Sequence, residues 1–218
     1  MSQQASLAAV LFDMDGTLID SEKLWSLALG EVAHELGGTL SAETRLSMVG
    51  TDLVSSVQML LDDLGVDAEL DVVQRLLVDA TAQHFTTSIE WRPGAQELLQ
   101  LVHDANLPTA LVTSTHRNLT SLALETIGRG YFDVIVCGDD VSHTKPHPEP
   151  YLTALAALHA DPTRSVAIED SPAGSRSAAA AGLATLVVPL ELPVEAAPGL
   201  TITDTLVGVT LGTLRSLL

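Results

Sequence analysis

The hydrophobic residues of the chain form two kinds of pattern. Five short runs are almost wholly apolar: AAVLF (8–12), TALVTS (109–114), DVIVCG (133–138), SVAIED (165–170) and ATLVVP (184–189). Strands that are apolar on both faces are typical of a parallel sheet lying between two layers of helices. Helical periodicity connects the later runs, over 94–105, 116–127, 148–159 and 172–181. This alternation predicts an α/β fold with a doubly wound, Rossmann-like parallel sheet.

Residues 21–88 interrupt the alternation, because they carry only helical periodicity, divided by turn signals at Gly37-Gly38, Gly50 and Gly65. We therefore expect residues 1–20 and 89–218 to form an α/β core domain and residues 21–88 to form a small inserted helical cap domain. Open α/β sheets bind ligands at the carboxyl ends of their strands. An insert that directly follows the first strand is thus placed to cover a binding site. The tail over 190–218 predicts one last short strand and a helix.

The composition excludes several classes of partner. The 218 residues include 10 Lys and Arg against 28 Asp and Glu, for a net charge of −18, which disfavours nucleic acid and anionic membranes. The single cysteine, Cys137, excludes an internal disulfide and lies in an apolar run, so we expect a buried thiol. The start of the chain lacks a basic segment typical of a signal peptide, and the most apolar stretch, 178–190, is too short to span a bilayer. We expect a monomeric cytoplasmic protein.

Polar residues gather where the predicted strands end. They are Asp13, Asp15 and Thr17 after the first strand, Thr113, Ser114 and Thr115 after the second, Lys145 after the third, and Glu169 and Asp170 at the fourth. Because parallel strands end at the same edge of a sheet, these side chains are expected to converge. Carboxylates at close range raise one another's pKa, and a divalent cation relieves that conflict. Oxygen ligands of this kind suit Mg²⁺, which commonly shares its coordination shell with a phosphate.

Each of these groups also has an ordinary structural interpretation. Asp13 and Asp15 suit a polar strand end before a turn, and Thr113–Thr115 suit a helix N-cap that leaves backbone N–H groups free for a phosphate. Ser171 can cap a helix that has Pro172 at its first position. Lys145 can be a solvated loop lysine, although the prolines that follow it stiffen the loop. The four groups taken together, in this order, favour one polar site.

Four motifs, DMDGTLID, VTSTHRN, KPHPEPY and IEDSPAG, occur in that order around the helical insert. In this the chain resembles the haloacid dehalogenase-like hydrolase superfamily, in the branch of small-cap phosphatases and β-phosphoglucomutase relatives. The resemblance covers nearly the whole chain. It implies a Mg²⁺-dependent phosphatase that hydrolyses a small phosphorylated metabolite, such as a sugar phosphate, through an aspartyl-phosphate intermediate.

The resemblance also implies roles for individual residues. Asp13 would be the nucleophile and Asp15 the general acid and base. Asp13, the backbone carbonyl of Asp15, and Asp170 would hold Mg²⁺, with Glu169 orienting a metal-bound group. The residues that would hold the phosphoryl group are Gly16, Thr17, Thr113, Ser114 and Lys145.

Other functions remain open at this level. A β-phosphoglucomutase is expected to carry a cap histidine twelve residues after the nucleophile, where this chain has Trp25, and its expected cap arginine has no match in MVGTDLVSS. A phosphonatase would use a cap lysine, and Lys23 is the one candidate. A non-enzymatic phosphoacceptor domain also gathers aspartates, a hydroxyl and a lysine, but it is much shorter and lacks a cap.

Three further readings of the sequence find little support. No G-x-G-x-x-G follows a strand, and neither lysine follows a glycine, which disfavours a dinucleotide site and a P-loop. His143 and His147 are four residues apart, but Pro146 lies between them, so a zinc pair on one helix face is not expected.

Overall fold

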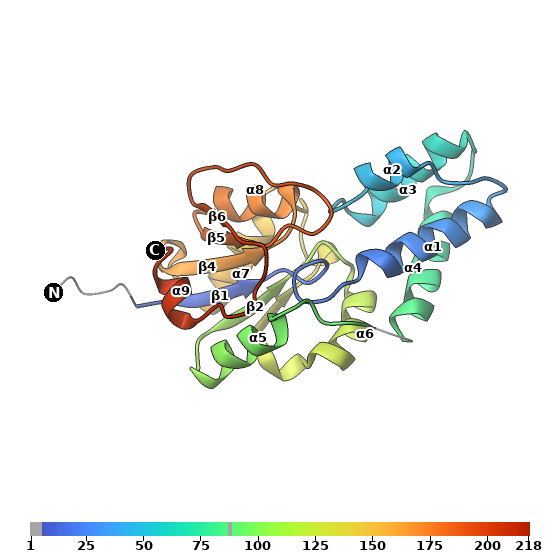
Figure 1. The fold of residues 1–218 in the computed structure, drawn as a ribbon. Helices are drawn as coiled ribbons and strands as arrows, with labels where there is room; N and C mark the ends of the chain where they lie inside the picture. Colours follow the sequence, from blue (N-terminus) through green and yellow to red (C-terminus); the bar gives the residue numbers. More distant parts are fainter. Residues whose placement is uncertain (1–5, 87–88) are drawn as a thin grey trace.

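The computed structural model describes residues 6–86 and 89–218. Within these residues one sheet of parallel strands lies at the centre of the molecule (Figure 1), in the order β3-β2-β1-β4-β5-β6. The strands are β1 (Ala9–Phe12), β2 (Thr109–Val112), β3 (Val134–Val136), β4 (Ser165–Glu169), β5 (Ala184–Val187) and β6 (Leu200–Ile202). The predicted doubly wound α/β fold is confirmed, and so is the last short strand in the tail.

Helices alternate with these strands along the chain. They are α5 (Ala95–Asp104), α6 (Arg117–Ile127), α7 (Glu149–Leu158), α8 (Pro172–Ala180) and α9 (Leu211–Arg215), with short 3-10 helices at η1 (Arg129–Tyr131), η2 (Gly138–Asp140) and η3 (Pro162–Arg164). The bounds of α5 to α8 agree with the predicted ranges to within one residue.

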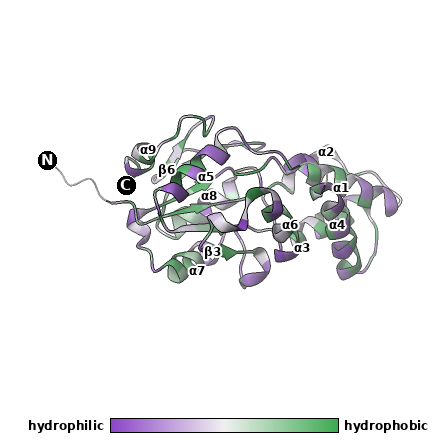
Figure 2. Ribbon diagram, turned by 90° about the horizontal axis from the view of Figure 1, so that it is seen from below, coloured by the Kyte–Doolittle hydropathy of each residue, from purple (hydrophilic) through white to green (hydrophobic). Residues whose placement is uncertain are grey.

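Both faces of the sheet are covered because successive side chains of a strand point in opposite directions. Val10 and Phe12 of β1 belong to an apolar cluster with residues of α5 and α6. Ala9 and Leu11 belong to a second cluster, with residues of α7 and α8. Hydrophobic strands accordingly lie inside a shell of helices that are hydrophilic on the outside (Figure 2). This explains why the strand segments are almost wholly apolar.

The segment after β1 contains four helices joined by turns, in agreement with its predicted helical periodicity. It contains α1 (Glu22–Glu35), α2 (Ala42–Ser47), α3 (Leu53–Leu64) and α4 (Leu70–Phe85). These helices have an apolar cluster of their own, which includes Val32, Leu60 and Leu77. We refer to α1–α4 as the helical cap. The predicted boundary at 88/89 involves residues 87 and 88, which lie outside the described residues, so the domain limits stay a prediction.

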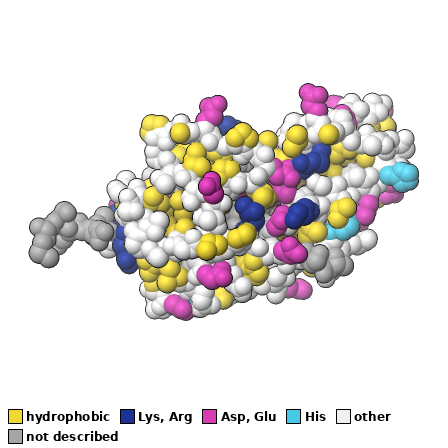
Figure 3. Space-filling model, in the orientation of Figure 1, with side chains coloured by type: hydrophobic (Ala, Val, Ile, Leu, Met, Phe, Trp, Pro, Cys, Tyr) yellow, Lys and Arg dark blue, Asp and Glu magenta, His cyan; other side chains and the backbone are white. Residues whose placement is uncertain are grey.

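The helical cap lies beyond the carboxyl ends of the strands (Figure 1). Side-chain contacts join it to the core: Arg45 of α2 forms an ion pair with Glu191 at 2.5 Å, Trp25 of α1 donates to Asp15 at 3.3 Å, and Thr144 donates to Asp52 at 3.3 Å. On the face drawn in Figure 3, basic and acidic side chains lie next to one another near the junction of the two parts. The edge of the sheet on which the predicted residues converge is therefore covered by the cap.

Two smaller expectations concern Cys137 and membrane association. Cys137 is buried as predicted, and burial raises the pKa of its thiol to about 11. Among the helices described here, none combines the length and the apolar character that crossing a membrane requires.

Candidate active site

Asp13 is the first residue after β1 and lies at the centre of the polar cluster. Its backbone N–H donates to Ile168 of β4, which fixes it beside the end of that strand. Oδ1 accepts a hydrogen bond from Lys145 at 2.6 Å, whereas Oδ2 is buried and has no hydrogen-bond partner among the described residues. Burial raises the pKa of Asp13, the positive charge of Lys145 lowers it, and the negative charges of Glu169 and Asp15 raise it further; the result is a pKa of about 7. One carboxylate oxygen is thus left available for a ligand.

The ammonium of Lys145 lies inside the cluster, not in solvent, so the interpretation as a solvated loop lysine is wrong. Its three N–H groups donate to Asp13 at 2.6 Å, to Glu169 at 2.6 Å and to the carbonyl of Val112 at 2.8 Å. Burial alone would lower the pKa of Lys145, but the charges and hydrogen bonds of Asp13 and Glu169 raise it above its usual value. Lys145 is therefore a fixed positive charge within an acidic protein.

Glu169 is fully buried at the end of β4, and both of its carboxylate oxygens accept hydrogen bonds from neighbouring groups of the protein. Oε1 accepts from Lys145 and, at 2.7 Å, from the hydroxyl of Tyr151. Oε2 accepts from the backbone N–H of Asp170 and from the hydroxyl of Ser171. A Cβ at Gly174, in the first turns of α8, would collide with this carboxylate, so only glycine fits there. Glu169 is held chiefly as a partner of Lys145.

Asp170 lies beside Asp13 and is almost as deeply buried. Burial, with the charges of Asp13 and Glu169, raises its pKa well above the usual value. Thr17 donates to it at 3.3 Å, and Gly16, at φ +80°, passes so close to its carboxylate that a Cβ would collide with it. Gly16 and Thr17 therefore contact Asp170 and are not among the residues that line the pocket described below. Their predicted role in phosphate binding stays a prediction.

Asp15 is held apart from the other carboxylates by four donors. Oδ1 accepts from Ser21 at 2.6 Å and from the indole N–H of Trp25 at 3.3 Å, and Oδ2 accepts from Thr113 at 3.2 Å and Thr115 at 2.7 Å. Asp13 and Asp15 line the same pocket, as their spacing predicts. Their environments differ: Asp13 accepts a hydrogen bond from the Lys145 ammonium, whereas Asp15 accepts hydrogen bonds from hydroxyl and indole groups of both the core and the cap.

The hydroxyl residues after β2 do not cap a helix. The helix α6 begins at Arg117 after His116, so the expected N-cap at Thr113–Thr115 is wrong. Thr113 instead accepts from the backbone N–H of Thr115 at 3.0 Å while it donates to Asp15. The hydroxyl of Ser114 lines the pocket, is buried and has no hydrogen-bond partner among the described residues. Ser171, by contrast, caps α8 through the N–H of Gly174, with Pro172 at the first helical position, as predicted.

Asp13, Glu169 and Asp170 together make a candidate site for a divalent cation. One oxygen from each lies within 4.8 Å of the others. The unpartnered oxygen of Asp13 and the raised pKa values of Asp13 and Asp170 indicate negative charge that the protein alone does not compensate. A hard cation with oxygen ligands, such as Mg²⁺, fits this donor set. Because Glu169 is occupied by Lys145 and Tyr151, Asp13 and Asp170 are the better placed ligands.

A pocket between the core and the cap opens onto these residues. It has a volume of about 90 Å³, enough for several water molecules or one small polar group. From the core it is lined by Asp13, Asp15, Thr113, Ser114, Lys145 and Asp170, and from the cap by residues that include Trp25, Met48, Val49 and Gly50. Trp25, at the position where a mutase is expected to carry histidine, and the turn at Met48–Gly50 are thus pocket residues.

Two charged pocket residues were missed in the sequence. Glu22, in the first turn of α1, lies near Asp15 and Glu191, and burial with these charges raises its pKa to about 8. Arg45 of α2 also lines the pocket, paired with Glu191 and donating to Ser26 at 2.9 Å. Both residues lie at polar positions of helices, and in the sequence such positions look like ordinary solvent-exposed ones. Only the location of the cap over the strand ends marks them as pocket residues.

Comparison with known proteins identifies the family. Residues 10–188 match the family described as haloacid dehalogenase-like hydrolase. The chain is a haloacid dehalogenase-like hydrolase. The predicted family is confirmed, and with it the prediction that the protein is an enzyme of the hydrolase class. The alternative of a non-enzymatic phosphoacceptor domain is thereby wrong.

Several members of the family are similar along most of their length. A phosphorylated carbohydrates phosphatase of Thermotoga maritima is 33% identical over 181 residues, covering 81% of this chain and 82% of the relative. Hexitol phosphatase B of Escherichia coli is 31% identical over 193 residues, covering 87% and 86%. Among solved structures, CbbY from Rhodobacter sphaeroides in complex with phosphate superposes with a TM-score of 0.87 at 28% identity, covering 95% of this chain and 99% of that one.

Proposed function

We propose that this hydrolase is a Mg²⁺-dependent phosphomonoesterase that acts on a small phosphorylated carbohydrate or polyol through an aspartyl-phosphate intermediate. The observation that carries the proposal is the state of Asp13, whose carboxylate opens onto the pocket with one oxygen bound to Lys145 and the other unpartnered. A carboxylate placed in this way is available as a nucleophile toward phosphorus.

The first half of the reaction uses both aspartates. A carboxylate oxygen of Asp13 attacks phosphorus, the bond from phosphorus to the ester oxygen breaks, and that oxygen takes a proton from Asp15. Lys145, the hydroxyl of Ser114 and the backbone beside it would stabilise the negative oxygens of the transferring group, a role supported by the bond from Lys145 to Asp13 and by the place of Ser114 in the pocket lining. When bound between Asp13 and Asp170, Mg²⁺ would supply further charge neutralisation for the phosphoryl oxygens.

The second half returns the enzyme to its starting state. Water attacks the phosphorus of the aspartyl phosphate and gives its proton to Asp15, so that inorganic phosphate and the free Asp13 carboxylate are released. Asp15 must therefore act with and without its proton. The hydroxyl groups of Ser21, Thr113 and Thr115 suit both states, because a hydroxyl donates to a carboxylate and accepts from a carboxylic acid.

The relatives and the cap side of the pocket support the substrate class. The Thermotoga and Escherichia coli relatives are named as phosphatases of phosphorylated carbohydrates and of hexitol. In this chain, Glu22, Ser26, Thr51 and Ser56 place carboxyl and hydroxyl groups on the cap side. Groups that both donate and accept hydrogen bonds match the hydroxyls of a sugar or polyol.

The indole of Trp25 favours hydrolysis over the mutase reaction. It occupies the position at which a β-phosphoglucomutase is expected to carry histidine, and its N–H donates to Asp15. Indole neither loses nor gains a proton to any significant extent near neutral pH, so Trp25 does not provide acid or base catalysis for sugar transfer.

We also propose that the protein is cytoplasmic and monomeric, as the sequence leads us to expect.

Release of inorganic phosphate from an aryl phosphate and from a panel of sugar and polyol phosphates tests the function. Wild-type protein should be active with Mg²⁺, inactive with EDTA, and active again when Mg²⁺ is restored. Asp13→Asn should lose about a thousandfold or more in kcat, whereas Asp71→Asn, an exposed change on α4, should keep full activity. Full activity of Asp13→Asn would overturn the nucleophile, and isomerised sugar phosphate without free phosphate would establish the mutase instead.

A further inference from the structure

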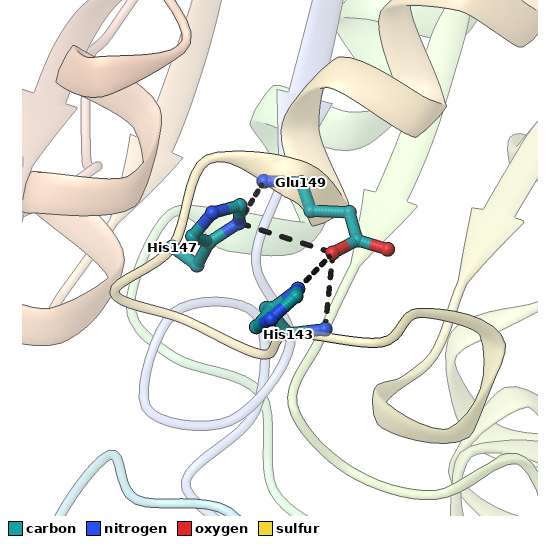
Figure 4. Close-up of side chains that lie close together, drawn as sticks. All are labelled: His143, His147 and Glu149. Carbon is teal, nitrogen blue, oxygen red and sulfur yellow. Dashed lines mark hydrogen bonds and ion pairs between the residues drawn. The ribbon is translucent and has the colours of Figure 1, made fainter.

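Outside the pocket, three side chains able to bind a metal meet where the loop after β3 enters α7: His143 and His147 of the loop and Glu149, the first residue of the helix (Figure 4). One ligand atom from each lies within 4.8 Å of the others. The Nδ1 atoms of His143 and His147 are 2.8 Å and 3.9 Å from Oε2 of Glu149. Pro146 rules out a helix through the two histidines, but the loop curls and brings the imidazoles to 4.6 Å between ring centroids.

The carboxylate of Glu149 is held in place by the backbone of the same loop. The N–H groups of Ser142 and His143 donate to Oε1 and Oε2 at 2.9 Å and 3.0 Å. These bonds and the one from the His143 ring lower the pKa of Glu149. The carboxylate is therefore charged and oriented, as a metal ligand has to be.

The two imidazoles are accessible and one already has the required form. The side chains of His143 and His147 are 66% and 50% exposed. Nδ1 of His147 accepts the backbone N–H of Glu149 at 3.2 Å, so this nitrogen carries a lone pair, which a metal ion would take over from that hydrogen bond. Bonds of about 2.1 Å around a tetrahedral ion place the ligand atoms about 3.4 Å apart, so the exposed rings would rotate to bring their nitrogens closer together when the ion binds.

We propose that His143, His147 and Glu149 form a binding site for one divalent transition-metal ion such as Zn²⁺. Two imidazoles and one carboxylate select Zn²⁺, Ni²⁺ or Cu²⁺ over Mg²⁺, which prefers oxygen ligands. Three protein ligands leave at least one position to water. The site differs in chemistry and in place from the buried acidic cluster at Asp13.

A metal at this site would tie together the two ends of the segment that carries Lys145. Besides the bonds of Lys145 itself, the segment is joined to its surroundings by the bond from Ser177 to the carbonyl of His147 at 2.6 Å and by the bond from Thr144 to Asp52 of the cap. Closing residues 143 and 149 on one ion removes freedom from the backbone that presents the Lys145 ammonium to Asp13. The expected consequence is local ordering of residues 141–149.

Calorimetric titration of the full-length protein with Zn²⁺ tests the site, with excess Mg²⁺ present to occupy the acidic cluster. One equivalent should bind to the wild type. The double variant His143→Gln/His147→Gln should bind at least about tenfold more weakly, and each single variant should also be weakened. The matched control His34→Gln/His103→Gln changes two exposed histidines elsewhere and should bind as the wild type does.

Hydrogen exchange locates the ion independently of catalysis. Zn²⁺ should slow amide exchange in peptides spanning 141–149 of the wild type and leave these peptides unchanged in the double variant. Without Zn²⁺, the circular dichroism of the double variant should equal that of the wild type. Equal Zn²⁺ affinity in the wild type and the double variant would overturn the proposal, as would protection confined to peptides that contain Asp13 or Asp170.

Discussion

The ammonium of Lys145 lies 2.6 Å from Oδ1 of Asp13, although 132 residues separate the two in the chain. The same ammonium lies 2.6 Å from Glu169, and both side chains are buried with it. Buried charges are tolerated when each has a partner of opposite sign, and their removal one at a time leaves an uncompensated charge. The cluster therefore stabilises the fold only while it stays complete.

Lys145→Met should remove activity and destabilise the protein by about 3–5 kcal/mol. The loss should be larger at about pH 8 than at about pH 5. The reason is that Lys145 lowers the pKa of Asp13, which is about 7 in the wild type, so in the variant this pKa rises further. At about pH 5 the carboxyl is neutral in both folded proteins, whereas at about pH 8 keeping or removing its proton costs the variant more folding free energy than it costs the wild type. Urea unfolding at both pH values measures this. Lys23→Met, at an exposed ion pair with Asp20, should leave stability almost unchanged.

Gly174→Ala should destabilise the protein by about 1–3 kcal/mol or more, because its Cβ would displace the Glu169 carboxylate from Lys145. The change should also reduce kcat. Gly30→Ala is the matched control, since Gly30 lies inside α1 with no atom within 4 Å of its added Cβ. There alanine should stabilise the helix by up to about 1 kcal/mol. Thermal unfolding of both variants measures the two changes in stability. Equal changes in Gly174→Ala and Gly30→Ala would contradict the crowding at Gly174.

Glu22→Gln should change how stability depends on pH in the absence of metal. The pKa of Glu22 rises from 4.5 to about 8 on folding, so its ionisation costs stability as the pH increases through that window. Glutamine removes the cost, and the variant should be more stable than the wild type at about pH 8, by about 5 kcal/mol at most, and equally stable at about pH 4. The same dependence of stability on pH in the wild type and in Glu22→Gln would contradict this. Glu43→Gln, on the exposed side of α2, should follow the wild type.

Thr115→Val should lower kcat about ten- to a hundredfold with little effect on KM, because valine keeps the shape of threonine but removes the donor 2.7 Å from Asp15. The hydroxyl orients Asp15 for proton transfer and does not itself bind the substrate in this proposal. Thr201→Val, at an exposed position of β6, is the control and should retain wild-type kinetics. A change confined to KM would instead indicate a substrate contact.

The core of the site was predictable from the sequence because its residues stand next to strand ends. Asp13 directly follows β1, and Glu169 ends β4 with Asp170 behind it, so a parallel sheet is sufficient to bring them together. The position of Lys145 in the site was harder to predict, because Lys145 lies on a loop after β3 and the geometry of the strands does not fix the course of a loop. Its prolines and its position in an ordered set of motifs supported the prediction.

The sequence by itself determined the doubly wound sheet, the helical insert and the group of carboxylates, hydroxyls and lysine at one edge. These follow from local periodicity and from the shared direction of parallel strands, which are properties of short segments. Only the tertiary structure decided which atoms pair: the four donors around Asp15, the capture of Glu169 by Lys145 and Tyr151, the entry of Glu22 and Arg45 into the pocket, and the meeting of His143 with His147. Such contacts depend on how the cap and the loops are placed over the sheet, and that placement results from packing between segments distant in the chain.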